Sequence, residues 1–70
     1  MKYLVVIEKT GTGYSAYSPD VPGCIATGAS RDEVELEIKA AISFHLEGLK
    51  QEGEKPPQSS TSAAYIEVPV

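Results

Sequence analysis

The sequence predicts an α+β fold with the element order β-β-β-α-β, in which a small antiparallel sheet carries one long helix on a face. Three observations predict this fold. An alternating run of β-branched and aromatic residues opens the chain, turns rich in glycine and proline separate the next short runs, and one helical pattern covers residues 30–53. Seventy residues provide for one hydrophobic core, so residues 1–70 are expected to form a single domain.

The first predicted element is a strand over residues 2–9, KYLVVIEK, which is rich in β-branched and aromatic side chains. Tyr3, Val5 and Ile7 point to one face, and Leu4 and Val6 point to the other. Because both faces are apolar, we expect both sides of the sheet to be covered, one by the helix and the other by a second subunit.

The next elements are short and separated by turns. Residues 10–13, with two glycines, predict a hairpin turn that leads into an antiparallel strand over residues 14–18. In the following wide loop, Pro22 and Gly23 fit the central positions of a type II turn. Residues 24–28 then predict a third strand that leads into the helix.

The helix is predicted from its ends and its periodicity. Ser30 is a favourable N-cap, and Glu33 completes a capping box with it. Gly53 and the prolines that follow it end the helix. At 1.5 Å per residue this helix is about 33 Å long and overhangs any short strand. Its predicted core-facing side chains are Val34, Ile38, Ala41, Ile42, His45 and Leu49, with Leu46 at their edge.

Leu36, Ala40 and Phe44 form a second, thinner apolar stripe on the far side of the helix. A helix that covers only its own sheet does not need this stripe, so it predicts a contact with another subunit. One cysteine excludes an internal disulfide, and no Cys/His cluster offers a zinc site, which leaves self-association into a dimer or tetramer to stabilise so short a chain. Gly48 lowers helix stability and predicts the close approach of a neighbouring backbone.

The chain after the helix divides into two parts. Residues 54–63 are polar and patternless and predict a surface loop. Residues 64–70, AYIEVPV, predict a final strand. Because this strand contains Pro69, it either lies at the edge of the sheet or ends at Pro69.

The net charge and the distribution of apolar residues restrict the kinds of partner and the cellular location that we expect for the protein. A net charge of −4 disfavours direct nucleic-acid binding and favours a basic protein partner. The N-terminus carries no signal peptide pattern, and no apolar segment approaches the length of a membrane span. We therefore expect a cytoplasmic protein with no membrane contact.

The chain resembles a known family at specific residues. The loop motif Tyr14-x-Ala16-x-x-Pro19-Asp20-x-Pro22-Gly23-Cys24, the helix end HLEGL at residues 45–49 and the terminal YIEV at residues 65–68 are similar to the HicB-like antitoxin domain. The likeness covers nearly the whole chain in the right order, and the loop followed by the helix end is its most specific part.

The resemblance implies a partial RNase-H-like fold, a dimer or higher assembly, and a partner. That partner is a small basic mRNA-cleaving toxin resembling HicA, which family antitoxins neutralise by covering its active surface. Many family members also carry a C-terminal DNA-binding domain that represses their own operon. The sequence ends at Val70, and we expect the chain to lack this domain.

The sequence favours protein binding over catalysis. For the partner-binding surface we select Tyr14, Tyr17, Asp20 and Glu67. We expect no catalytic residue, no metal site and no cofactor. Cys24 is typical of a small buried residue, and His45 lies on the core-facing side of the helix. Asp20, between two prolines, is typical of a residue that caps a turn with its side chain.

Two alternatives to the antitoxin function stay open. One is an orphan oligomeric domain without a partner. The other is a remnant of a nuclease-like fold with weak metal-dependent RNase activity, for which Glu8 and Asp20 are the carboxylates to test.

Overall fold

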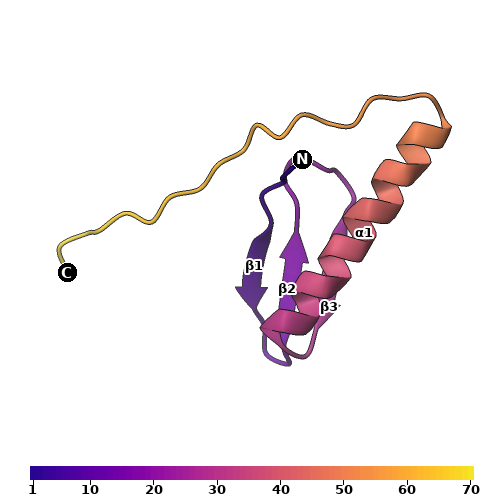
Figure 1. The fold of residues 1–70 in the computed structure, drawn as a ribbon. Coiled ribbons are helices and arrows are strands. Elements are labelled where there is room, and N and C mark those ends of the chain that lie inside the picture. The colour runs from indigo at the N-terminus through magenta and orange to yellow at the C-terminus, as the bar shows by residue number, and fades with distance from the viewer.

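The computed structural model describes residues 1–70 and shows a three-stranded antiparallel sheet with one long helix on a face (Figure 1). The strands β1 (Val6–Lys9), β2 (Tyr14–Tyr17) and β3 (Ile25–Gly28) lie in the order β1-β2-β3, and α1 (Arg31–Gln51) follows them. The α+β class and the first four predicted elements are therefore confirmed. β1 is shorter than predicted, because residues 2–5 have no strand partner.

The turns have the predicted geometry. In the β1–β2 hairpin, the backbone N–H of Thr10 donates to the carbonyl oxygen of Gly13 at 2.8 Å. In the loop before β3, the N–H of Cys24 donates to the carbonyl oxygen of Val21 at 3.2 Å, and Gly23 has a φ of +85°. That left-handed position is the one that a type II turn reserves for glycine.

Both ends of α1 are capped. The side chain of Ser30 accepts a hydrogen bond from the N–H of Glu33 at 3.1 Å, and the carboxylate of Glu33 accepts one from the N–H of Ala29 at 3.0 Å. At the other end, Gly53 has a φ of +75°, its N–H donates to the Lys50 carbonyl, and the next N–H donates to the Leu49 carbonyl. This is a Schellman ending, so the helix stops where the sequence predicts. α1 does not combine the length and the apolar character needed to cross a membrane.

The core lies where α1 packs on β2 and β3 (Figure 1). Its buried apolar side chains come from β2, the following loop and the first half of the helix: Ala16, Val21, Cys24, Val34 and Ile38. The rest of the predicted core-facing stripe of α1, from Ala41 to Leu49, is only half-buried. The helix is 21 residues long and the strands are four residues each, so the second half of α1 extends beyond the sheet.

Gly48 does not have the predicted role. A Cβ placed at this position would meet no atom of the rest of the chain within 4 Å, so the predicted close approach does not occur within one chain. Gly48 flanks the core-facing stripe and is exposed because it lies in the part of the helix that extends beyond the sheet.

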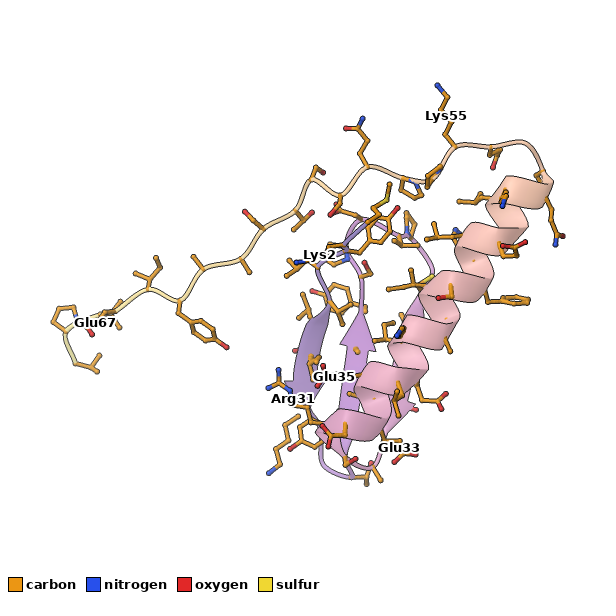
Figure 2. The ribbon with its side chains drawn as sticks, in the orientation of Figure 1. Lys2, Arg31, Glu33, Glu35, Lys55 and Glu67 are labelled. Atoms are coloured by element: carbon orange, nitrogen blue, oxygen red, sulfur yellow. The ribbon has the colours of Figure 1, made fainter.

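The predicted final strand does not form. Residues 54–70 contain no helix or strand, and residues 61–70 are all exposed. The segment crosses the N-terminal end of β1 and then leads away from the sheet (Figures 1 and 2). A strand requires a neighbour for its backbone hydrogen bonds, and this course leaves residues 64–70 without one.

Candidate partner-binding surface

The face of the sheet opposite α1 carries an apolar row that crosses all three strands. Ala16 of β2 points into the core, and strand alternation therefore turns Tyr17 to the opposite face. Val6 of β1 and Ile25 of β3 are the direct register partners of Tyr17 on either side. We call Val6, Tyr17 and Ile25 the outer row.

The outer row is accessible to a partner. The side chain of Ile25 is 74% exposed and that of Tyr17 is 42% exposed, whereas Val6 is half-buried. The next register row on the same face is polar and consists of Glu8, Ser15 and Thr27. A sheet face that meets water is normally polar throughout, so an exposed apolar row beside a polar one is typical of a protein-binding surface.

The two tyrosines of the predicted site lie on opposite faces of the sheet. Tyr17 belongs to the outer row, while Tyr14 packs against the core on the helix side. They are three residues apart in one strand, and an odd separation places side chains on different faces. Tyr14 therefore supports the sheet and does not share a surface with Tyr17.

Asp20 holds the chain that follows the helix. Its carboxylate accepts hydrogen bonds from the backbone N–H groups of Ser60 and Thr61, at 3.0 and 2.9 Å, and from both hydroxyl groups, at 3.4 and 2.6 Å. The hydrogen bonds from Thr61, followed by those from Ser60, lower the pKa of Asp20 below its ordinary value. We call this arrangement the Asp20 clamp. The prediction that Asp20 caps its own turn was wrong, because the groups that its carboxylate binds are forty and forty-one residues away in sequence.

Glu67 lies far from the other predicted site residues. It is near the end of the segment that leads away from the body of the protein, where it is exposed (Figure 2). Within one chain, the structure therefore does not bring Tyr14, Tyr17, Asp20 and Glu67 together on one surface.

The residues predicted for self-association are exposed. Leu36 is 69% exposed and Phe44 is 84% exposed, and Ala40, one turn from each of them, is exposed as well. No other part of the chain covers this stripe. Its role in assembly stays a prediction.

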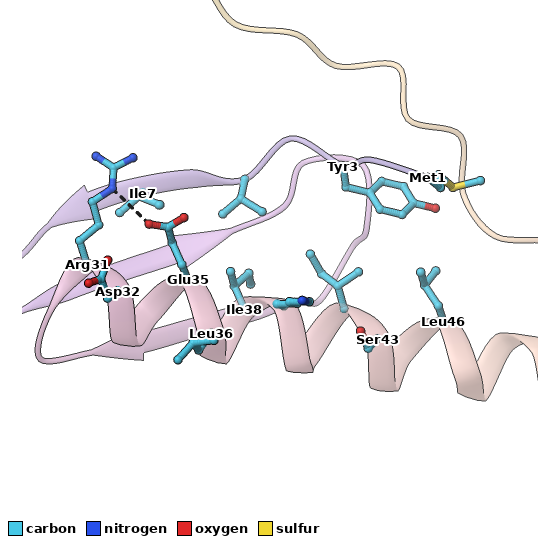
Figure 3. Close-up of a pocket in the computed structure, with 13 residues that line it drawn as sticks. Met1, Tyr3, Ile7, Arg31, Asp32, Glu35, Leu36, Ile38, Ser43 and Leu46 are labelled. Carbon is cyan, nitrogen blue, oxygen red and sulfur yellow. Dashed lines mark ion pairs between the residues drawn. The ribbon is translucent and has the colours of Figure 1, made fainter.

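A groove of about 870 Å³ lies between the N-terminal segment and α1 (Figure 3). We call it the lateral groove. Most of its apolar lining comes from Tyr3, Val5 and Ile7 on one side and Ile38, Ile42 and Leu46 of α1 on the other. Arg31 and Glu35 lie at one end, where the Arg31 Nε atom and a Glu35 carboxylate oxygen are 3.5 Å apart.

The cysteine and the histidine lie in the positions that the sequence predicts. Cys24 is buried, its thiol donates to the carbonyl oxygen of Ala41 at 3.8 Å, and burial raises the pKa of the thiol, which keeps it protonated and unreactive. His45 is half-buried on the core-facing side of α1. No group of three His, Cys, Asp or Glu residues gathers where it could hold a metal ion.

The sequence patterns do not single out Ile25, and they place Val6 only on the second face of its strand. The signal for Ile25 was strand alternation, because Cys24 is expected to be buried and the next residue of a strand points to the opposite face. The missing information was the strand register, which alone places Ile25 directly beside Tyr17.

Comparisons with known proteins identify the family. The family model of the HicB_like antitoxin of bacterial toxin-antitoxin systems matches residues 3–69. A protein of Haemophilus phage HP1, from its rep-hol intergenic region, is 44% identical over 69 residues, which are 99% of this chain and 52% of that protein. A UPF0150 protein of Thermoplasma acidophilum is 39% identical over 67 residues, 94% of this chain and 97% of that protein.

The chain thus spans about half the length of the phage relative and nearly all of the archaeal one. A solved structure, the HicA3 and HicB3 toxin-antitoxin complex, contains a chain that matches with a TM-score of 0.69 and 30% sequence identity over 86% of this chain and 70% of that chain. Because the family model covers almost every residue and the fold agrees, this chain belongs to the HicB-like antitoxin family.

Proposed function

We propose that this chain is an antitoxin that binds a small basic RNase toxin resembling HicA and prevents that toxin from cleaving RNA. The observation that carries the proposal is the outer row, an exposed apolar surface on a sheet face that nothing in the chain covers. Membership of an antitoxin family and the likeness to a chain of a HicA3 and HicB3 complex support this choice of partner.

The charge of the chain supports the same kind of partner. A net charge of −4 attracts a basic protein over a distance and orients it before contact. In this arrangement Ile25 and Tyr17 form the apolar centre of the interface, and Glu8 lies beside them in the polar row. Aromatic and large apolar side chains at such centres carry most of the binding energy of an interface.

In this proposal the predicted site residues have different roles. Tyr17 contacts the toxin, Tyr14 supports the sheet beneath the surface, and Asp20 fixes the course of the chain after the helix. Glu67, near the C-terminus, contributes negative charge to the attraction of the basic toxin. No residue has a catalytic role, because the chain acts by occupying the surface of its partner.

The test is co-purification of the chain with the small basic protein encoded beside its gene, combined with an assay of RNA cleavage by that protein. We expect a stable complex in which cleavage is abolished. Ile25→Asp, which places a charge at the centre of the outer row, should weaken binding at least tenfold and restore cleavage, because a buried unpaired charge opposes association.

Thr12→Asp is the matched control, because it adds the same charge in the exposed hairpin turn, away from the outer row. This variant should bind like the wild type. If Ile25→Asp also binds and inhibits like the wild type, the outer row is not the toxin-binding surface. If no partner is inhibited by the wild-type chain, the antitoxin proposal is wrong, and the orphan-domain and nuclease-like alternatives are then separated by an assay of metal-dependent RNA cleavage by the chain itself.

A further inference from the structure

We propose that the lateral groove is filled by the C-terminal tail of a second copy of this chain, so that two copies exchange their tails. Here the tail is residues 62–70, which follow the Asp20 clamp. The tail adds as a strand to the free edge of β1, and its apolar side chains enter the groove. This contact concerns self-assembly and is separate from toxin binding on the outer row.

The receiving surface is incomplete within one chain. α1 packs on β3 and β2, which leaves the inner side of β1 open as the lateral groove. β1 is an edge strand, so one line of its backbone N–H and carbonyl groups faces no neighbouring strand. Residues 2–5 have the strand pattern but form no strand, and pairing along this edge would complete the strand that the sequence predicts over residues 2–9.

The tail has the pattern that this surface requires. Ile66, Val68 and Val70 alternate along the tail, so in a strand all three point to one face. Tyr65 and Glu67 point to the other face. All five side chains are exposed in the single chain, and the apolar ones have no contact that would account for their alternation. An added strand with this pattern places three aliphatic side chains against Val5, Ile7 and Ile42.

The length of the tail is also suitable. Nine residues in extended conformation reach about 30 Å, and a strand over residues 2–9 is about 26 Å long. The tail can therefore pair along the whole edge.

The structure directs the tail away from the groove of its own chain. The hydroxyl group of Tyr3 donates to the carbonyl oxygen of Pro57 at 2.6 Å, and the Asp20 clamp holds Ser60 and Thr61. These contacts lead the chain across the end of the sheet and outward, as Figure 1 shows.

To enter its own groove, the tail would have to bend back toward the sheet after the clamp, whereas Figure 1 shows it leading away from the sheet. The residues available for that bend are Ser62, Ala63 and Ala64. Serine favours turns only weakly, and none of the three is a glycine, proline, asparagine or aspartate, whereas the chain has such residues at every turn that it makes before α1.

The overall dimensions agree with an exchanged element. The radius of gyration is 13.9 Å, compared with about 11 Å for a compact domain of this length, and the longest dimension is 50 Å. Exchange of an identical tail between two copies fills both grooves at once and closes the assembly as a symmetric dimer. In such a dimer, the outward-directed tail with its apolar face forms part of the interface between the two copies.

The first test measures the mass of the full chain in solution by light scattering. The double variant Ile66→Asp/Val68→Asp should have half the mass of the wild-type assembly, because it places two charges in the apolar groove. Glu67→Gln, which changes the opposite face of the tail, is the matched control and should keep the wild-type mass. Because the tail makes no contact with the core, helix content measured by circular dichroism should be equal in all three proteins. A double variant that keeps the wild-type mass would overturn the proposal.

The second test distinguishes exchange between copies from insertion into the same chain. One chain carries Val68→Cys, and a second chain, which is larger by a tag, carries Lys39→Cys at the rim of the groove. After the two are mixed, a short bifunctional maleimide should join chains of different size. Cys24 does not interfere, because it is buried, and wild-type chains should not be joined. Cross-linking only within a chain that carries both substitutions would show that the tail folds onto its own groove.

Discussion

Asp20 connects two parts of the chain that lie forty residues apart. Its carboxylate accepts hydrogen bonds from two successive backbone N–H groups and their side-chain hydroxyls, which satisfies both of its oxygens. A charged carboxylate is a stronger acceptor than a neutral carboxylic acid. The hydrogen bonds that hold Ser60 and Thr61 therefore depend on the ionisation of one residue.

The Asp20 clamp should open in acid. The pKa of Asp20 is lowered from its ordinary value of 3.8 by its hydrogen bonds to Thr61 and Ser60, so the clamp contributes fully above that ordinary value. Its contribution decreases below pH 3.8 and is lost as the pH falls through the lowered pKa. The amide NMR signals of Ser60 and Thr61 should follow this transition. In Asp20→Asn they should not titrate, and a wild-type midpoint at or above 3.8 would contradict the clamp.

At the scale of elements, α1 is the part of the chain most fully specified by local sequence. Ser30 and Glu33 fix its start, and Gly53 fixes its end. Packing on the sheet covers only its first half, so the second half relies more on helix propensity and capping. Gly48, in that second half, is the weakest residue for helix formation there.

Gly48→Ala should therefore stabilise the protein. The added methyl group meets no atom within 4 Å, and alanine favours the helix over glycine by about 1 kcal/mol. We expect the free energy of unfolding in urea to rise by about that amount. Glu47→Gly, at the neighbouring exposed position, should lower it by about 0.6 kcal/mol for the same reason. A less stable Gly48→Ala variant would mean that this part of α1 packs against another chain.

At the scale of the whole molecule, three apolar surfaces remain uncovered. They are the outer row, the lateral groove, and the helix stripe of Leu36, Ala40 and Phe44. Five buried apolar residues are a small core for a chain of seventy. Domains of this size commonly obtain further burial by association, and each uncovered surface offers it.

Phe44→Glu should reduce the mass of the assembly, because it places a charge in the middle of the helix stripe. Phe44 is 84% exposed and makes no contribution to the core, so the variant should keep the wild-type helix content. Light scattering of the wild type and the variant at equal concentration measures the difference. If the two masses are equal, the stripe does not mediate self-association. Glu47→Gln, on the same exposed side of α1, is the control.

Much of the fold could be predicted because the signals are local. The hairpin glycines, the Pro22-Gly23 turn, the capping box and the alternation of Tyr3, Val5 and Ile7 act within a few residues. The candidate site depends on longer distances. Tyr17 could be selected from its strand, but its neighbours on the surface come from two other strands whose register no local pattern gives.

Periodicity and turn chemistry operate on neighbouring residues, so the sequence is sufficient to predict three short strands, one capped helix, the core-facing side of that helix and the likeness to an antitoxin family. Long-range packing places Tyr14 on the face that α1 covers and Tyr17 on the opposite face, joins Asp20 to Ser60 and Thr61, and leaves residues 64–70 outside the sheet, and no local pattern predicts these features. The apolar pattern of those last residues favours a strand, but a strand also needs a neighbour, and the clamp directs them away from the edge of their own sheet.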